Sequence, residues 1–178
     1  LAQPKNTPRC NTAPRNGHTT DNAGTLTRSV AAARSDSGTS AINNLAGGKF
    51  NVRASDRIFN NGGTITVSNA AGAMLTKSGA ATSLIATAFN NAGQVDITGG
   101  ALALSGAFTS SGTITVSPGA TMSATAGLTN APGGVIEGNG TLDLGGATLT
   151  NNGLLRPGGS GTVGTLTLIG SIDTGSGT

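Results

Sequence analysis

Two acidic residues, Asp96 and Glu137, are the side chains of this sequence best suited to acid–base chemistry. Glycoside hydrolases work with a pair of carboxyl groups about 5–10 Å apart. When the repeated segments described below are aligned, the two acids fall into one outward column, two coils apart, which corresponds to roughly 10 Å. That separation is compatible with an inverting hydrolase, so a polysaccharide-active enzyme is one hypothesis for the function.

The expected surroundings of these acids argue against catalysis. The outward column also holds Thr66, Thr115 and Arg156, while Asp143 lies outward on a second face beside Ser123 and Thr167. The chain has no Tyr or Trp that could form a platform for a sugar ring. We expect Glu137 and Arg156 to pair across adjacent coils on a solvated face, a contact worth about 0–1 kcal/mol. The sequence therefore predicts no catalytic residue.

Metal, cofactor and nucleophile motifs are also missing from the sequence. His18 is the only histidine, and a lone histidine is a poor zinc site and cannot complete a catalytic triad with any motif in this sequence. Cys10 is the only cysteine, which leaves an exposed thiol or an intermolecular disulfide as its options. The glycine-rich stretch at 158–161 lacks the lysine of a phosphate-binding loop. We expect neither a metal ion nor a cofactor.

Composition indicates many short strands rather than a compact helical globule. The chain has 178 residues, of which 30 are Gly and only 10% are charged, and its four Phe are its only aromatic side chains apart from His18. Thr, Ser, Asn and Ala alternate with Val, Ile and Leu, a mixture typical of strands joined by tight turns. No apolar run reaches 18 residues, so we expect no membrane span.

Charge is distributed unevenly along the chain. Residues 1–57 carry eight Lys or Arg against three Asp, a net charge of +5, and residues 58–178 carry two against four, a net charge of −2. A nucleic-acid interface gathers basic residues into a patch, often with aromatic side chains between them. Here the basic residues are scattered and lack such neighbours, so we expect no nucleic-acid partner.

A repeat near twenty residues dominates the second half of the sequence. Five similar segments begin at Phe59, Phe89, Phe108, Leu128 and Leu149, with intervals of 30, 19, 20 and 21 residues. Such a period indicates stacked units that cannot bury a core alone. We predict an all-β, right-handed parallel β-helix, a β-solenoid with three short strands per coil of about 20 residues. The 30-residue interval requires an inserted loop near residues 70–87 or an irregular coil.

Stacking of these coils should align equivalent side chains in ladders. The predicted inward ladders are Ile65, Val95, Ile114, Ile136 and Leu155 on the first strand, and Leu102, Met122, Leu142 and Leu166 on the second. The third strand carries Phe108, Leu128, Leu149 and Ile172. Asn61, Asn91, Asn130 and Asn152 should recur at one corner, where stacked amides can hydrogen-bond along the axis. Burying each aliphatic side chain contributes roughly 1.5–3 kcal/mol.

The chain divides into three parts. Residues 1–20 form a polar tail that should be disordered unless a neighbouring chain holds it. Residues 21–57 are degenerate N-terminal coils or a cap, with one plausible helical turn at Ser29–Arg34. Residues 58–178 hold the solenoid repeats. Leu1, Cys10, Ile172 and Thr178 are candidate assembly residues, because the open ends of a solenoid invite end-to-end pairing.

The repeat also resembles a known family. Asn-Asn-x-Gly-x-Ile/Val-x-Ile/Val followed by Gly-x-Leu-x-Leu-x-Gly is similar to the repeats of autotransporter passengers and filamentous-haemagglutinin-like exoproteins. Gly133–Leu144 and Leu155–Leu166 carry the resemblance most clearly, and it covers residues 58–172. It implies export across the outer membrane, a right-handed parallel β-helix, and adhesion or scaffolding. Residues 1–45 depart from the pattern.

Four functions therefore follow as hypotheses. The first is a structural or adhesive segment of a secreted bacterial surface protein, without catalysis, located outside the cell and contacting host or surface glycans or proteins. An extracellular filament subunit that polymerises through the solenoid ends is the alternative, and the polysaccharide-active enzyme is the second alternative. Ice binding would use rows such as Thr64/Thr66 and Thr113/Thr115, which charged residues interrupt.

Overall fold

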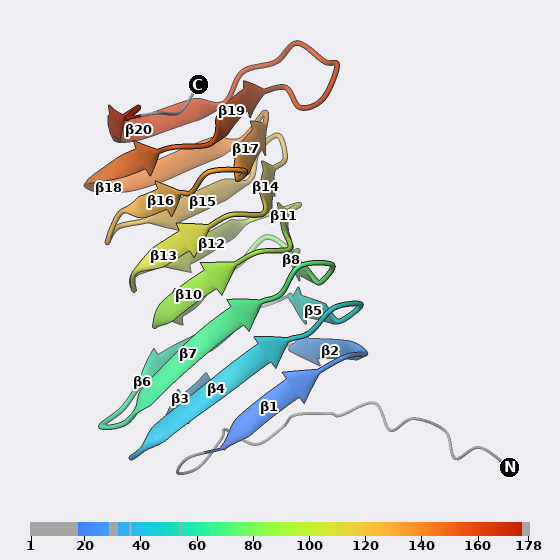
Figure 1. The fold of residues 1–178 in the computed structure, drawn as a ribbon, viewed down its shortest axis with the longest axis vertical. Coiled ribbons are helices and arrows are strands. Elements are labelled where there is room, and N and C mark those ends of the chain that lie inside the picture. The colour runs from blue at the N-terminus through green and yellow to red at the C-terminus, as the bar shows by residue number, and fades with distance from the viewer. Residues whose placement is uncertain (1–17, 29–31, 36, 54, 176–178) are drawn as a thin grey trace, which may run out of the picture.

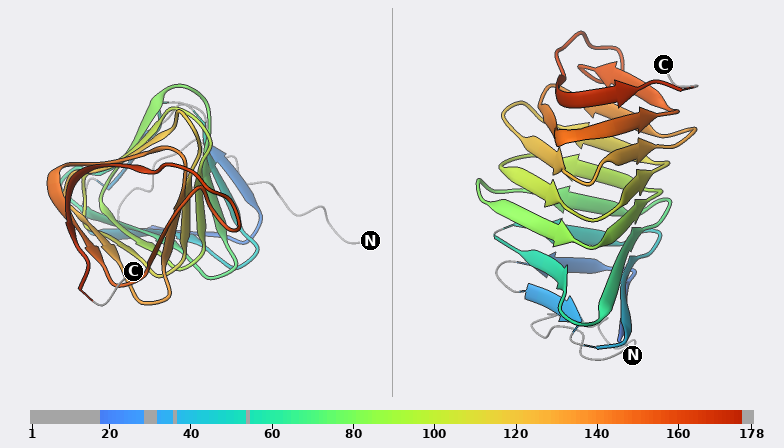
Figure 2. Two further views of the ribbon diagram at one scale, coloured as in Figure 1. Left: turned by 90° about the horizontal axis from the view of Figure 1, so that it is seen from above. Right: turned by 90° about the vertical axis from the view of Figure 1, so that its left-hand side faces the viewer.

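The computed structural model describes residues 18–28, 32–35, 37–53 and 55–175. These residues form twenty β-strands and no helix, wound into about seven coils of parallel strands. Each coil contributes three strands, so the stack is a triangular prism with three faces (Figure 2). In Figure 1 the chain crosses the front from left to right and returns behind as it rises, which makes the coil right-handed. The predicted β-solenoid is thus confirmed.

The strands of each face stack in register. Face 1 contains β1 (Thr19–Asn22), β4 (Thr39–Asn44), β7 (Thr64–Asn69), β10 (Ala88–Asn91), β13 (Phe108–Ser110), β16 (Leu128–Asn130) and the end of β18 (Thr141–Asn151). Face 2 contains β2 (Thr25–Arg28), β5 (Lys49–Val52), β8 (Met74–Lys77), β11 (Gln94–Ile97), β14 (Thr113–Val116), β17 (Val135–Gly138) and β19 (Leu154–Pro157). Face 3 contains β3 (Ala32–Ser35), β6 (Arg57–Asn60), β9 (Thr82–Ala86), β12 (Ala101–Leu104), β15 (Thr121–Ala124) and the start of β18. The last strand, β20 (Thr167–Asp173), lies on β18 along both faces 3 and 1.

Alternation along each strand builds the core. In β12 and β15 every second residue is buried, because successive side chains of a strand point to opposite faces. On face 2 the inward column runs through Leu26, Phe50, Leu75, Val95, Ile114, Ile136 and Leu155. These side chains belong to one core cluster, so the apolar interior is continuous along the axis.

A polar ladder runs along the corner between faces 1 and 2. It consists of Asn22, Asn44, Asn69, Asn91, Ser110, Asn130 and Asn151, all buried. The amide of Asn44 donates to Asn69 Oδ1 at 2.7 Å, and that of Asn69 donates to Asn91 Oδ1 at 2.8 Å. These amides also donate to main-chain oxygens of the next coil, so they join coils inside the turn.

Coil length in the first half differs from the prediction. Phe59 lies on β6 of face 3, whereas the register partner of Phe89 is Val67. No inserted loop fills the 30-residue interval, because β8 and β9 occupy it as ordinary strands. Partner residues on face 1 lie from 19 to 25 positions apart, as in Phe89–Phe108 and Thr39–Thr64, so the early coils are longer than twenty residues.

This shift corrects three predicted positions. Ile65 is buried on face 1 opposite Ser40, and Leu75 takes its expected place beside Val95. Asn61 lies in the turn between faces 3 and 1, outside the polar ladder. Thr66 is likewise on face 1. The cause is that similar Asn-Gly turns followed by alternating strands occur at two different corners.

Near the C-terminus two more predicted positions are off by one or two residues. Asn130 pairs with Asn151, so Asn152 is not in the ladder. Leu142 pairs with Leu168, and Leu166 packs against the core just before β20. The long connection after β19 hides this register in the sequence.

Further differences concern the N-terminal region and the threonine rows. Residues 32–35 form β3, so the expected helical turn is wrong there, and residues 29–31 lie outside the described residues. The first described strand begins at Thr19, inside the expected tail. Thr64/Thr66 and Thr113/Thr115 belong to faces 1 and 2, respectively, so these rows do not form one plane. None of the described residues forms a helix able to cross a membrane.

Candidate binding face

The third residue of each face 2 strand points outward, and these residues form one column of polar side chains. In register order these residues are Thr27, Asn51, Thr76, Asp96, Thr115, Glu137 and Arg156. The predicted neighbours Asp96, Thr115, Glu137 and Arg156 are therefore brought together, with Thr76 in the position expected for Thr66. Backbone pairing at strand spacing of about 4.8 Å fixes the rise between them.

An ion pair closes the C-terminal end of this column. Arg156 Nε and Nη2 both donate to Glu137 Oε2, at 2.9 and 2.5 Å. Thr115 Oγ1 also donates to Glu137 Oε1 at 3.4 Å. The side chain of Arg156 is 36% exposed and that of Glu137 is 16% exposed. Because the pair lies at the surface, its contribution to stability is about 0–1 kcal/mol.

The second carboxylate has its own partner. Gln94 Nε2 donates to both oxygens of Asp96, at 2.9 and 3.0 Å. Strand β14 separates β11 from β17, so the main chains that carry Asp96 and Glu137 are roughly 10 Å apart. Each carboxylate accepts hydrogen bonds from a neighbour on the same face. The column thus offers carboxylate, amide, hydroxyl and guanidinium groups in a fixed order.

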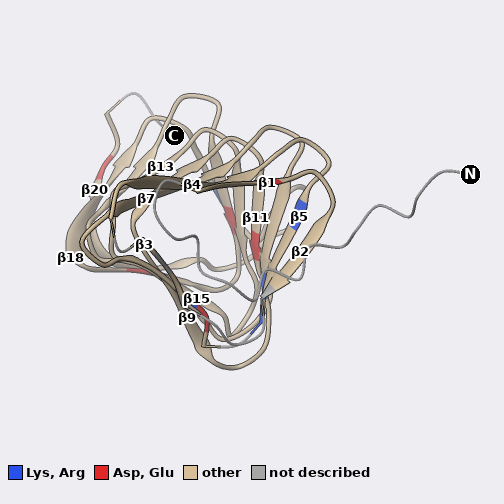
Figure 3. Cartoon of the chain, turned by 90° about the horizontal axis from the view of Figure 1, so that it is seen from below, with Lys and Arg blue, Asp and Glu red and all other residues tan. Residues whose placement is uncertain are grey.

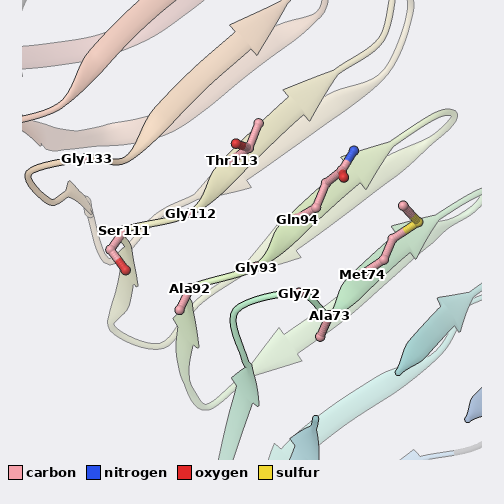
Figure 4. Close-up of a pocket in the computed structure, with 10 residues that line it drawn as sticks. All are labelled: Gly72, Ala73, Met74, Ala92, Gly93, Gln94, Ser111, Gly112, Thr113 and Gly133. Atoms are coloured by element: carbon pink, nitrogen blue, oxygen red, sulfur yellow. The ribbon is translucent and has the colours of Figure 1, made fainter. Parts of the chain in front are cut away.

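A shallow groove of about 370 Å³ adjoins the column at the corner between faces 1 and 2 (Figure 4). It is lined by Gly72, Ala73, Met74, Ala92, Gly93, Gln94, Ser111, Gly112, Thr113 and Gly133. Gln94 connects the groove to Asp96. A Cβ atom at Gly112 would overlap the carbonyl oxygen of Gly93, so glycine is required for the coils to approach at this corner. Sequence reasoning did not find the groove, because it depends on the shape of three successive turns.

The other predicted chemical groups lie away from face 2. Asp143 is on face 3 beside Ser123, and its other register partner is Ile169 rather than Thr167. Asp143 Oδ1 accepts a hydrogen bond from the main-chain N–H of Gly145 at 2.9 Å. His18 is exposed before β1, and Cys10 lies outside the described residues. Within the described ranges, no three His, Cys, Asp or Glu residues lie close enough together to hold a metal ion.

Charged residues are dispersed over the described surface. Lys49 lies on β5 and Asp96 on β11, and Figure 3 shows the coloured positions of charged residues scattered among uncharged strands. The described part of the molecule therefore presents separate charges rather than a patch of one sign.

Two charged residues of the described part are buried, Lys77 and Asp56, and sequence reasoning missed both. Lys77 occupies an inward position of β8 between Val52 and Ile97, and its side chain is fully buried. Its ammonium group donates to the carbonyl oxygens of Ser78, Gly79 and Gly99, at 2.9, 2.9 and 3.1 Å. Desolvation lowers the pKa of Lys77, and the nearby charge of Asp56 opposes that shift. The alternation of Leu75, Thr76 and Lys77 was the available signal.

Comparisons with known proteins do not identify a relative. No family of proteins, no curated protein and no solved structure matches the chain. The resemblance to autotransporter and haemagglutinin-like repeats consequently depends on the repeat pattern alone.

Proposed function

We propose that the chain is a structural or adhesive segment of a secreted bacterial surface protein. The observation that carries the proposal is the column of polar side chains that face 2 displays along a stack of seven strands. The stack is stiff, because parallel sheets and a continuous aliphatic interior join every coil to the next. Such a rod suits the display of weak contacts at regular intervals.

Adhesion would use the regular spacing of the face 2 column. Hydrogen-bonding groups recur at about 4.8 Å, the separation of neighbouring strands. A polar chain molecule lying along the axis could contact several coils at once, so individually weak contacts would add through multivalency. Glycans and proteins on a host or bacterial surface have the polar chemistry that this column complements.

A binding experiment with matched variants tests the adhesive role. The purified chain would be applied to immobilised glycans and matrix proteins, and compared with the face 2 variant Asp96→Ala/Thr115→Ala. The control variant Ser123→Ala/Asp143→Ala removes a carboxylate and a hydroxyl from face 3. We expect the face 2 variant to lose binding and the control to retain it. Equal binding by all three proteins would contradict the assignment of this face.

Location outside the cell is part of the same proposal. In cells that produce the protein, protease added to the medium should digest the chain while a cytoplasmic marker stays intact. Complete protection of the chain until the cells are lysed would contradict export.

Catalysis on polysaccharides is the second alternative, favoured by the two-strand separation of Asp96 and Glu137. In our proposal Gln94 and Arg156 hold these carboxylates for binding rather than for proton transfer. Release of reducing ends from a panel of polysaccharides, with Asp96→Asn and Glu137→Gln as controls, distinguishes the two. A polysaccharide that is cleaved by the wild-type chain and by neither variant would overturn the non-catalytic proposal.

The filament alternative requires two open ends. At the N-terminal end the inward residues Leu26 and Ala33 of the first coil are already buried, whereas Ile172 at the other end is exposed. Head-to-tail stacking would therefore need the N-terminal end to open. Electron microscopy of filaments that lengthen with protein concentration would favour this alternative over an isolated rod.

A further inference from the structure

The corner between faces 1 and 2 uses turns of two lengths. Each turn follows a residue of the polar ladder and ends where the next face 2 strand begins. The turns have four residues at 45–48, 70–73 and 131–134, and two residues at 23–24, 92–93, 111–112 and 152–153. The turn length thus varies from coil to coil, while the strands on both sides of the corner stay in register.

The groove at this corner is a consequence of that variation. The two short turns at 92–93 and 111–112 form its floor, and the long turns at 70–73 and 131–134 close it at either end. Figure 4 shows these turns following one another between Gly72 and Gly133. Strands β8 and β17, which follow the long turns, are three strand spacings apart, roughly 14 Å. The groove is therefore a site of limited length in the middle of the stack.

The lining of the groove offers uncharged hydrogen-bonding groups. None of its ten residues is charged. The hydroxyls of Ser111 and Thr113 make no hydrogen bond to the described part of the chain, so they can both donate to and accept from a ligand. Gln94 Nε2 is held by Asp96, which leaves Gln94 Oε1 as an acceptor. Met74 adds one apolar surface beside these polar groups.

This lining is poorly suited to a peptide. The main-chain N–H groups of residues 92 and 93 both donate to the carbonyl oxygen of Asn69, and those of residues 111 and 112 donate to that of Asn91. A peptide strand would therefore find no free main-chain donor on the floor of the groove. Met74 is the only large apolar side chain of the lining, so apolar side chains of a peptide would also lack a pocket.

An anionic ligand is also poorly suited to the groove. The Asp96 carboxylate lies directly behind Gln94, and the lining holds no Lys or Arg to balance a second negative charge. Sugar hydroxyls, in contrast, are neutral and both donate and accept. They match the hydroxyls and the amide oxygen of the lining, and the volume of about 370 Å³ lies within the range of about 300–1,000 Å³ of small-molecule sites.

We propose that the groove binds a short segment of a neutral glycan, about two sugar rings long. The inference rests on the proposed adhesive function and adds to it a discrete site beside the face 2 column. The C–H face of a ring packs on Met74, and ring hydroxyls exchange hydrogen bonds with Ser111, Thr113 and Gln94. A longer chain leaves the groove over the long turns, so further rings add little to the affinity.

The dependence of affinity on glycan length tests the closed ends. Neutral oligosaccharides of glucose, galactose, mannose and N-acetylglucosamine, from one ring to six, would be titrated into the full chain and followed by calorimetry. For a series that binds, we expect the affinity to rise up to about two or three rings and then to stay level. Oligogalacturonates of the same lengths are the anionic comparison and should bind at least tenfold more weakly.

Variants distinguish the groove from the face 2 column. Ala92→Leu and Ser111→Leu each place a large side chain on the exposed floor and should weaken binding of the neutral oligosaccharide at least tenfold. Ala23→Leu is the matched control, because Ala23 follows the first ladder asparagine as Ala92 follows a later one, outside the groove. Ser111→Ala/Thr113→Val removes the two hydroxyls without filling the groove and should weaken binding several-fold.

The outcomes separate this site from the adhesive function as a whole. The proposal is wrong if no neutral oligosaccharide of the panel binds, if both leucine variants of the groove bind as tightly as wild type, or if affinity still rises at six rings. Thr115→Ala/Glu137→Gln changes the face 2 column and leaves Gln94 and Asp96 in place. Loss of binding in that variant alone would assign the glycan to the column and overturn the groove site, although adhesion through face 2 would stand.

Discussion

The polar ladder at the corner between faces 1 and 2 has one interruption, which leads to a quantitative prediction. Asn91 Nδ2 donates to Ser110 Oγ at 3.0 Å, and Ser110 Oγ donates to the main-chain oxygen of Gly112. Asn130, the next member of the ladder, has a buried Oδ1 that receives no hydrogen bond. The serine is too short to continue the chain of amides that links the other coils.

Ser110→Asn should repair this interruption. The new amide would accept from Asn91 and donate to Asn130 Oδ1, as the asparagines of the earlier coils do. A buried unsatisfied acceptor costs about 1–3 kcal/mol, and the larger side chain introduces packing strain that offsets part of the gain. We expect a net increase in the free energy of unfolding of about 1–2 kcal/mol, equivalent to a rise in Tm of about 2–8 °C for a chain of this size.

Thermal and urea unfolding followed by circular dichroism would measure the effect, and two further variants make the result specific. Ser110→Ala removes the acceptor of Asn91 and should destabilise the protein by about 1 kcal/mol. In an Asn130→Ala background Ser110→Asn should bring no gain, because the acceptor that it would satisfy is gone. A Ser110→Asn protein no more stable than Ser110→Ala, or an equal gain without Asn130, would refute the reasoning.

Three other changes test separate parts of the account. Lys77→Met should lower the free energy of unfolding by about 1–3 kcal/mol, because it leaves buried carbonyl oxygens without a donor. The folded pKa of Lys77 lies below its unfolded value of 10.5, so the folded state loses its proton at a lower pH than the unfolded state does, and the free energy of unfolding of the wild type rises as pH rises toward 10.5. The difference in free energy of unfolding between wild type and Lys77→Met should therefore increase in that pH window. A difference that decreases there would contradict the burial of the ammonium group. Gly112→Ala should lower the free energy of unfolding by about 1–3 kcal/mol, because the new Cβ atom would overlap the Gly93 carbonyl. Gly24→Ala is the control: its Cβ atom would meet nothing within 4 Å, so the free energy of unfolding in urea should change by no more than about 0.5 kcal/mol. Glu137→Gln should lower the free energy of unfolding by about 0–1 kcal/mol at low salt and by less at high salt. A larger decrease, or one that does not depend on salt, would show that the ion pair with Arg156 is not solvated.

The later coils could be predicted from the sequence because their repeats are short and regular. Val95, Ile114, Ile136 and Leu155 follow one another at 19 to 22 residues, and the structure aligns them in one inward column. The same regularity placed Asp96, Thr115, Glu137 and Arg156 in one outward column. Alternation within each strand was sufficient there, because it fixes which side chains point inward.

The earlier coils could not be aligned because local patterns repeat at more than one corner. Phe59 and Phe89 are both followed by two asparagines and an alternating strand, yet they belong to faces 3 and 1. Backbone pairing between coils, which the sequence does not display, decides between such alternatives. Lys77 shows a second limit, since the sequence does not display the three carbonyl oxygens and the nearby charge of Asp56 that make a charged residue acceptable at an inward position.

Distances along the outward column of face 2 test the central claim, that the coils stack in the register described. Spin labels at Thr27 and Thr115 are separated by four strand spacings, roughly 19 Å, and labels at Thr27 and Arg156 by six, roughly 29 Å. Electron–electron resonance should give one narrow distance for each pair, lengthening by about 5 Å per coil once the label arms are allowed for. Broad distributions, or a distance between Thr27 and Arg156 no longer than that between Thr27 and Thr115, would contradict the stacked solenoid.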